Sequence, residues 1–137
     1  MADTFHAQIL TPEGKLFDGE VLGVQVPGSS GSFEILANHA PIISTLEIGV
    51  IRIHTPDRST LYLAVSGGFV EMNKNRMTLL AEAAEKAEEI DVDRAKLAKE
   101  RALELLSSKD ADRIEAEVAL KRAVNRLAVV EKLSKAS

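Results

Sequence analysis

Residues that break helices are confined to the first half of this 137-residue chain. All eight glycines lie at or before Gly68, and all four prolines lie at or before Pro56. Every aromatic residue, from Phe5 to Phe69, occupies the same half. Beyond Gly68 the sequence is dominated by Ala, Leu, Glu, Lys and Arg, which are good helix formers. The chain therefore divides into two parts that must fold into different classes of structure.

Short stretches of alternating apolar and polar residues, separated by turns, fill the first half. The clearest are residues 5–9, 24–26, 51–54, 61–65 and 77–80. A period of two places one face of a strand in a core, and turns that contain Gly, Pro, Asn or Asp separate such strands. Many short strands within about 80 residues predict a small β-sandwich or barrel.

The second half predicts two helices. Asp91 suits a helix N-cap, and Asp93 adds an acidic side chain to the first turn, where the helix dipole favours it. Residues 107–110 then interrupt the pattern, and Asp110 or Asp112 can cap a second helix. Apolar residues recur at spacings of three and four in both segments, first at Ala95, Ala98, Ala102 and Leu105, and then at Ala116, Leu120, Ala123, Leu127 and Val130. The short connection between them predicts an antiparallel hairpin.

The predicted seam between these helices is rich in alanine. Alanine lets helices approach closely but buries little apolar area, at about 25 cal/mol per Å². A two-helix unit with such a seam is expected to be only marginally stable by itself. We therefore predict that the hairpin opens when another surface offers more burial. A permanently docked hairpin is the alternative.

Composition and motifs exclude several classes of protein. The absence of cysteine rules out disulfides and thiolate metal sites. No apolar run approaches the roughly 20 residues that cross a bilayer, and the first residues lack a signal-peptide pattern, so no direct membrane insertion is expected. A formal net charge of −4 disfavours nucleic acid as a partner. His6, His39 and His54 lack metal-ligand spacing, and there is no phosphate-binding loop or nucleophile elbow, so neither a metal site nor a catalytic residue is predicted.

Four arginines of the predicted hairpin share one flank. At 100° per residue, Arg94 and Arg101 are nearly aligned beside the first apolar stripe, and Arg122 and Arg126 lie on the flank of the same hand beside the second. In an antiparallel pair these flanks face the same side, and the guanidinium groups fall within about 10–12 Å along the axis. Planar cations at this density suit a polyphosphate. The alternative is four solvated arginines paired with nearby glutamates.

Four segments at characteristic intervals stand out: residues 10–14, 31–41, 49–53 and 66–70. Among them, Asn38-His39-Ala40-Pro41 is quite specific. Together they resemble the epsilon subunit of bacterial F-type ATP synthase, and the resemblance spans essentially the whole chain. It implies an α+β fold, with an N-terminal β-sandwich of about ten short strands over residues 1–84 and a C-terminal antiparallel two-helix hairpin over residues 85–137.

The resemblance also implies partners and a location. The chain would be a non-catalytic part of the central stalk, coupling the rotor to the catalytic head and bound to the gamma subunit and to the c-ring of the membrane sector. It would lie peripherally on the cytoplasmic face of a bacterial cell membrane, with the thylakoid as the alternative. His39 is expected at the interface with gamma or the c-ring; alternatively, it satisfies a turn beside Pro41.

Residues 90–95 resemble a second motif, the Ile/Leu-Asp-x-x-Arg-Ala sequence by which some bacterial epsilon subunits bind ATP. By resemblance, Ile90 and Asp91 meet the adenine, and Arg94 with the later arginines meets the phosphates. The nucleotide-binding residues expected on this basis are Glu85, Ile90, Asp91, Arg94, Ala95, Arg101, Arg122 and Arg126. ATP is thus expected as a regulatory ligand and not as a catalytic cofactor, and whether Mg²⁺ accompanies it stays open.

These resemblances imply a two-state switch. With ATP bound, the hairpin is folded and the complex turns over. When ATP is scarce, the hairpin extends along gamma into the catalytic head of alpha and beta subunits and inhibits ATP hydrolysis. Such a switch requires that ATP bind one state better than the other. The rival is a purely structural coupling subunit with a fixed hairpin and no nucleotide binding.

Overall fold

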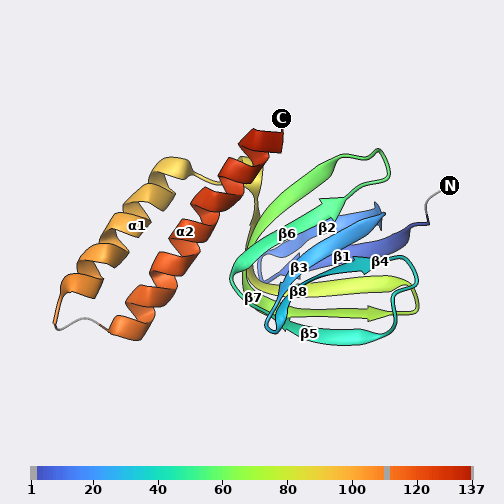
Figure 1. The fold of residues 1–137 in the computed structure, drawn as a ribbon, viewed down its shortest axis with the longest axis horizontal. Coiled ribbons are helices and arrows are strands. Elements are labelled where there is room, and N and C mark those ends of the chain that lie inside the picture. Colours follow the sequence, from blue (N-terminus) through green and yellow to red (C-terminus); the bar gives the residue numbers. More distant parts are fainter. Residues whose placement is uncertain (1–2, 110–111, 137) are drawn as a thin grey trace. The chain divides into compact units, whose positions relative to one another are not determined.

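The computed structural model describes residues 3–109 and 112–136 (Figure 1). The chain divides into two compact units, Met1–Lys86 and Ala87–Ser137. The first is built of strands and the second of helices, as the distribution of helix breakers predicts. Among the described helices, none is both long enough and apolar enough to span a bilayer.

Eight strands form the first unit. They are β1 (Phe5–Thr11), β2 (Gly14–Val21), β3 (Gly23–Gly28), β4 (Gly31–Leu36), β5 (Ile42–Leu46), β6 (Gly49–His54), β7 (Thr60–Asn73) and β8 (Arg76–Lys86). The five alternating stretches of the sequence fall within β1, β3, β6, β7 and β8, which confirms them as strands. The number is eight and not about ten because β7 and β8 continue without a break over 14 and 11 residues.

The strands pair in the order β2-β1-β8-β7-β5-β3-β4, and β6 pairs with both β3 and β7. β1 and β8 are parallel, and the other neighbours are antiparallel. The first part of β7, from Thr60 to Val65, pairs with β6, and its last part, from Gly68 to Met72, pairs with β5. β7 therefore belongs to both layers of the sandwich.

Two consecutive glycines mark the point where β7 changes neighbours. Gly67 and Gly68 have φ angles of +78° and +124°, which side chains disfavour. A Cβ on Gly68 would lie 2.1 Å from the backbone oxygen of Leu80 on β8. Any side chain at Gly68 therefore requires the backbone of β7 or β8 to move.

Large apolar side chains from both layers fill the sandwich. In β1 the side chains of Phe5, Ala7 and Ile9 are buried, whereas those between them are not, which is the predicted alternation. The largest fully buried side chains include Phe5, Ile9, Ile35, Ile51, Ile53, Leu63, Met72, Met77 and Leu79. This is one continuous core, built from residues that are far apart in the sequence.

The second unit consists of the short 3₁₀ helix η1 (Ala87–Glu89) and of α1 (Val92–Ser107) and α2 (Arg113–Ala136). Figure 1 shows α1 and α2 side by side and antiparallel, which confirms the predicted hairpin. Asp91 is the N-cap of α1, because its Oδ1 accepts the backbone N–H of Arg94 at 3.1 Å. Asp112 accepts the backbone N–H of Glu115 at 3.1 Å in the same way. The other predicted cap, Asp110, lies outside the described residues.

Alanines form the seam of the hairpin. Ala95 and Ala102 of α1 and Ala116 and Ala123 of α2 are each at most 3% exposed. Seven residues span about two helical turns, so each pair lies on one line along its helix. These four positions confirm the predicted alanine-rich seam.

One apolar position of the predicted stripes is wrong, and one buried position was not predicted. Leu105 is 49% exposed, and Val129 is fully buried whereas Val130 is only half-buried. At 100° per residue, Leu105 lies about 80° from the line through Ala95, which explains its exposure. Val129 lies about 140° from the line through Ala116, so α2 buries a second side. Besides α1, the element of this unit that packs against α2 is η1.

Candidate functional site

The seam sets which residues of the two helices lie at the same level. The chain folds back over residues 108–112, and both helices bury alanines that are seven residues apart. Folding back about residue 109 would bring Ala102 level with Ala116 and Ala95 level with Ala123. Neighbouring side chains on the flanks are placed relative to these pairs.

Three of the four candidate arginines lie at nearly one level of the hairpin. With a rise of 1.5 Å per residue, Arg94 of α1 falls between Arg122 and Arg126 of α2, about 3 Å from each along the axis. Arg101 lies about 10 Å further along α1. Arg94, Arg101 and Arg122 are exposed, and Arg126 is half-buried. Helical rise thus places these arginines along one stretch of the hairpin, and we call Arg94, Arg101, Arg122 and Arg126 the arginine flank.

The members of the arginine flank differ in their contacts. Within residues 3–109 and 112–136, neither Arg94 nor Arg101 forms an ion pair with a carboxylate. Arg122 and Arg126 both interact with other groups of the protein. The side-chain donors of Arg94 and Arg101 are consequently available to an anionic ligand.

The segment before α1 carries three further candidates. Ile90 is 8% exposed and Ala95 is 3% exposed, so both side chains are buried. Asp91 is exposed, and only its Oδ1 is used to cap α1, which leaves Oδ2 for another donor. Because η1 packs against α2, this segment lies beside α2 within the unit.

The eighth candidate, Glu85, belongs to the other compact unit. It lies near the end of β8, directly opposite Ala64 of β7, and it is half-buried. The structure thus gathers the seven hairpin candidates into one unit and places Glu85 in the sandwich.

His39, the candidate interface residue, lies in the loop between β4 and β5. The ring nitrogen Nδ1 is 2.7 Å from the backbone oxygen of Ala40. The backbone N–H of His39 donates to the backbone oxygen of Leu36 at 3.1 Å. Since a carbonyl oxygen only accepts, Nδ1 is the nitrogen that donates, and Nε2 is the nitrogen that Ala40 does not contact. The half-buried ring is therefore held by its own loop through one nitrogen, and its interface role stays a prediction.

The His39 loop is also held from outside. Asn75, in the turn between β7 and β8, accepts the backbone N–H of Asn38 at 2.7 Å through Oδ1. The same side chain donates through Nδ2 to the backbone oxygen of Thr4 at 3.2 Å. Sequence reasoning missed this bridge. The asparagines at positions 38 and 75 are the sequence signal for it, because Asn tolerates a left-handed backbone. Asn38 has a φ of +63° and Asn75 a φ of +60°.

A second missed cluster surrounds His6 on the outer face of β1 and β2, with Asp18 and Glu20 as its neighbours. Its members come from adjacent strands, so no spacing within the sequence announces it. Across the described residues, no set of three or more His, Asp or Glu side chains is arranged to hold a metal ion.

Comparison with known families accounts for both units. The beta-sandwich domain of the ATP synthase Delta/Epsilon chain matches residues 4–87, and the long alpha-helix domain of the same chain matches residues 88–131. The chain belongs to the ATP synthase delta/epsilon chain family. This confirms the resemblance found in the sequence and the predicted class, a non-catalytic chain of an enzyme complex.

Relatives of this epsilon-type chain align over nearly its whole length. The ATP synthase epsilon chain of Desulfitobacterium hafniense strain Y51 is 47% identical over 128 residues, which cover 93% of this chain and 96% of the relative. That of Bacillus pumilus strain SAFR-032 is 46% identical over 130 residues, covering 94% and 98%. A chain of the Euglena gracilis mitochondrial ATP synthase, from a structure of OSCP, F1 and the c-ring, shares the fold, with a TM-score of 0.81 and 23% identity. The match covers 91% of this chain and 80% of the Euglena chain.

Proposed function

We propose that this chain is the epsilon subunit of the central stalk of an F-type, proton-translocating ATP synthase, and that its hairpin is an ATP-responsive inhibitor of ATP hydrolysis. The bacterial relatives named ATP synthase epsilon chain support the first part. A Tetrahymena thermophila chain of similar fold, with a TM-score of 0.60 and 17% identity, comes from a structure described as central stalk and c-ring. On this proposal the partners are gamma and the c-ring, and the chain sits peripherally on the cytoplasmic face of a bacterial cell membrane.

The observation that carries the second part is the arginine flank. Arg94, Arg122 and Arg126 fall within about 6 Å along the hairpin axis, by helical rise. Guanidinium groups bind phosphate oxygens in a bidentate manner, and closely spaced phosphates match closely spaced guanidiniums. Asp91 lies three residues before Arg94, and its Oδ2 offers an acceptor to the amino group of an adenine.

The alanine seam explains how a ligand could control the hairpin. Each buried methyl group contributes roughly 0.8 kcal/mol, so four seam alanines hold the helices weakly compared with leucine or isoleucine. A nucleotide that bridges α1 and α2 through Arg94 and Arg126 stabilises the closed hairpin only. Without it, the equilibrium shifts toward the extended form, in which the net positive segment from Arg113 onward enters the alpha and beta head.

The sandwich supplies the permanent attachment in this proposal. The loop with His39 contributes to the contact with gamma or the c-ring, and Asn75 keeps that loop in place through its bridge to Asn38. Nε2 of His39, the nitrogen that Ala40 does not use, is then the group offered to the partner.

Calorimetric titration of the intact chain with ATP tests the nucleotide site. We expect saturable binding that weakens at least tenfold in Arg94→Ala and in Arg126→Ala, because a hydrogen bond to a charged group contributes about 1.5–3 kcal/mol. Lys96→Ala is the matched control, since Lys96 is also exposed and lies near Arg94 but about 160° away around α1. Absence of saturable binding in the intact chain would leave the purely structural coupling subunit as the function.

The inhibitory role has a separate test. The ATPase rate of the assembled complex is measured with the full chain and with a chain that ends at residue 85, over a range of ATP concentrations. We expect truncation to raise hydrolysis at low ATP and to have less effect at high ATP. An unchanged rate at every ATP concentration would rule out inhibition by the hairpin.

A further inference from the structure

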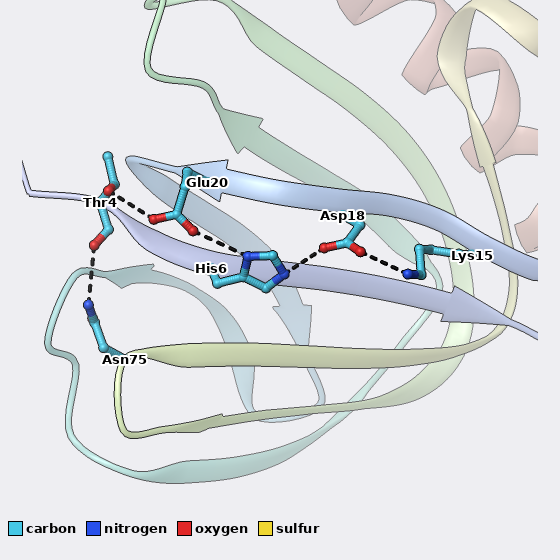
Figure 2. Close-up of polar contacts among 6 residues, drawn as sticks. All are labelled: Thr4, His6, Lys15, Asp18, Glu20 and Asn75. Atoms are coloured by element: carbon cyan, nitrogen blue, oxygen red, sulfur yellow. Dashed lines mark hydrogen bonds and ion pairs between the residues drawn. The ribbon is translucent and has the colours of Figure 1, made fainter.

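His6 of β1 lies between two carboxylates of β2. Figure 2 shows its ring flanked by Asp18 and Glu20: Nε2 is 2.5 Å from Asp18 Oδ1, and Nδ1 is 3.2 Å from Glu20 Oε2. Glu20 is directly opposite His6 in the strand register, and Asp18 is opposite Gln8, two residues along. The three side chains therefore project from the same face of the sheet.

Both contacts are favourable only when both ring nitrogens donate. An ionised carboxylate accepts hydrogen bonds and cannot donate them, and a neutral imidazole has one N–H and one lone pair. A neutral His6 would hold its lone pair against a carboxylate oxygen at hydrogen-bonding distance. Both contacts are therefore satisfied together only by the imidazolium form of His6.

Each carboxylate is fixed by a second donor (Figure 2). Lys15 Nζ lies 2.8 Å from Asp18 Oδ2, and Thr4 Oγ1 donates to Glu20 Oε1 at 3.1 Å. The pKa of Asp18 is below its ordinary value of 3.8, chiefly because Lys15 donates a hydrogen bond to it, with a smaller effect of His6. Asp18 is thus ionised throughout the range of about pH 5 to 8 in which histidines change charge.

Other charges around the ring oppose its protonation. Lys15 reaches the cluster from β2, and Arg76 lies directly opposite His6 on β8, the other neighbour of β1. These cations act on the ring without contacting it in the described structure, whereas Asp18 and Glu20 are within hydrogen-bonding distance. Among the charged side chains around the ring, Asp18 and Glu20 are therefore the two that contact it directly.

His54 on β6 gives an internal comparison. Its Nε2 lies 3.4 Å from Glu34 Oε2, but its Nδ1 lies 3.2 Å from the hydroxyl of Thr60. A hydroxyl both donates and accepts, so a neutral His54 can donate through Nε2 and accept through Nδ1. The same type of side chain is therefore satisfied without a second proton here, and His6 is not.

We propose that His6 is a proton-dependent clasp for β2. The imidazolium ties β2 to β1, and loss of its second ring proton releases Glu20 and loosens the strand. β2 pairs with β1 alone among the described strands, so no other strand compensates for this loss. The clasp makes one edge of the sandwich respond to the pH of its compartment. This response does not depend on the nucleotide site.

Hydrogen exchange of the β2 amides in the intact chain, residues 15–20, tests the clasp at about pH 5.5 and pH 8.5. After correction for intrinsic rates, we expect the opening constant to rise about fivefold at the higher pH, because an exposed ion pair contributes up to about that factor. Glu20→Gln should reduce the rise, since an amide faces either form of the ring favourably, and the remaining pH dependence comes from the Asp18 contact. His6→Gln should abolish it, and His54→Gln should leave it intact.

Three results would overturn the proposal. One is an opening constant of β2 that is the same at both pH values in the unmodified chain. Another is a rise of unchanged size in Glu20→Gln, which retains His6 and so serves even where His6→Gln does not fold. The third is a rise that disappears in His54→Gln, because the titrating group would then be His54.

Discussion

The sandwich and the hairpin build their cores in opposite ways. In the sandwich, side chains as large as Phe5 and Ile51 are fully buried between layers that are distant in the sequence. In the hairpin, the seam consists of Ala95, Ala102, Ala116 and Ala123. Burying an isoleucine contributes about 1.5–3 kcal/mol, whereas a methyl group contributes roughly 0.8 kcal/mol. The part of the chain that is proposed to move is the part that loses least by opening.

The two units also depend on different kinds of interaction. The hairpin relies on local ones: helix propensity, the Asp91 and Asp112 capping contacts, and an i,i+4 pair between Arg113 and Glu117 at 3.5 Å. The sandwich relies on pairing between strands that are far apart, such as β1 with β8. Local interactions re-form quickly after opening, and long-range pairing does not. A unit held by local interactions is therefore the better switch.

The largest effect is expected for Gly68→Ala. The new Cβ would clash with the backbone oxygen of Leu80, and φ would stay at +124°, so the sandwich should lose about 4 kcal/mol or more. Urea denaturation followed by the fluorescence of Tyr62, the only tyrosine, measures this in the sandwich. Far-ultraviolet circular dichroism should retain the helical signal of the hairpin.

Gly31→Ala is the control for this variant. Gly31 has a similar φ of +128°, but no other atom lies within 4 Å of the position that a Cβ would take there. Backbone strain alone should lower the free energy of unfolding of the sandwich by about 1–2 kcal/mol. Equal losses in the two variants would mean that the close approach of β7 and β8 at Gly68 is unimportant.

Truncation of a core residue in each unit tests the comparison directly. Ile51→Ala should destabilise the sandwich by about 3–4 kcal/mol, from lost burial and a residual cavity. Ala102→Gly should destabilise the hairpin by about 1 kcal/mol, mainly through helix propensity. Amide hydrogen exchange resolves the two units within one sample. Comparable losses would contradict a hairpin core that is much weaker than that of the sandwich.

Enlarging a seam residue should have a smaller but unit-specific effect. Ala123 is fully buried, so Ala123→Leu should overpack the seam and cost the hairpin about 2 kcal/mol, or roughly a 30-fold rise in its opening constant. Ala128→Leu is the control, because Ala128 is exposed on the same helix and should change stability by less than about 0.5 kcal/mol. If both variants behave alike, the helices do not approach each other closely at Ala123.

Secondary structure followed from the sequence because local periodicity fixes it, and the arginine flank stays a prediction from the same periodicity. Phe5, Ala7 and Ile9 alternate, and Arg94 and Arg101 are seven residues apart, so their faces are set before any partner is known. Leu105 was predicted to be buried but is exposed. A spacing of three or four residues does not determine which side of the helix packs against the other helix.

The polar clusters did not follow from the sequence because they depend on register. Glu20 meets His6 across a strand pair, 14 residues away, and Asn75 meets Thr4 and Asn38 at separations of 71 and 37 residues. Register is set by the backbone pairing of whole strands, and a shift of one residue would turn Glu20 to the other face. The full length of β7 was likewise missed, since its bend at Gly67 and Gly68 looks like a turn in the sequence.

The smallest predicted effect is that of acid pH on the thermal stability of the sandwich. In the turn between β6 and β7, Asp57 Oδ1 accepts the Thr55 hydroxyl, the Ser59 hydroxyl at 2.7 Å and the Ser59 backbone N–H at 3.2 Å. The Thr55 bond, followed by those of Ser59, holds the pKa of Asp57 below its ordinary value of 3.8. Because the folded value is the lower one, this stabilisation is complete above that ordinary value and is lost as the pH falls through the folded pKa. Asp57→Asn keeps the acceptor oxygen but does not titrate, so its sandwich should lose less thermal stability than the unmodified chain between about pH 6 and pH 3. Melting curves followed by Tyr62 fluorescence measure the difference, and an identical acid slope in both chains would show that the turn does not couple to folding.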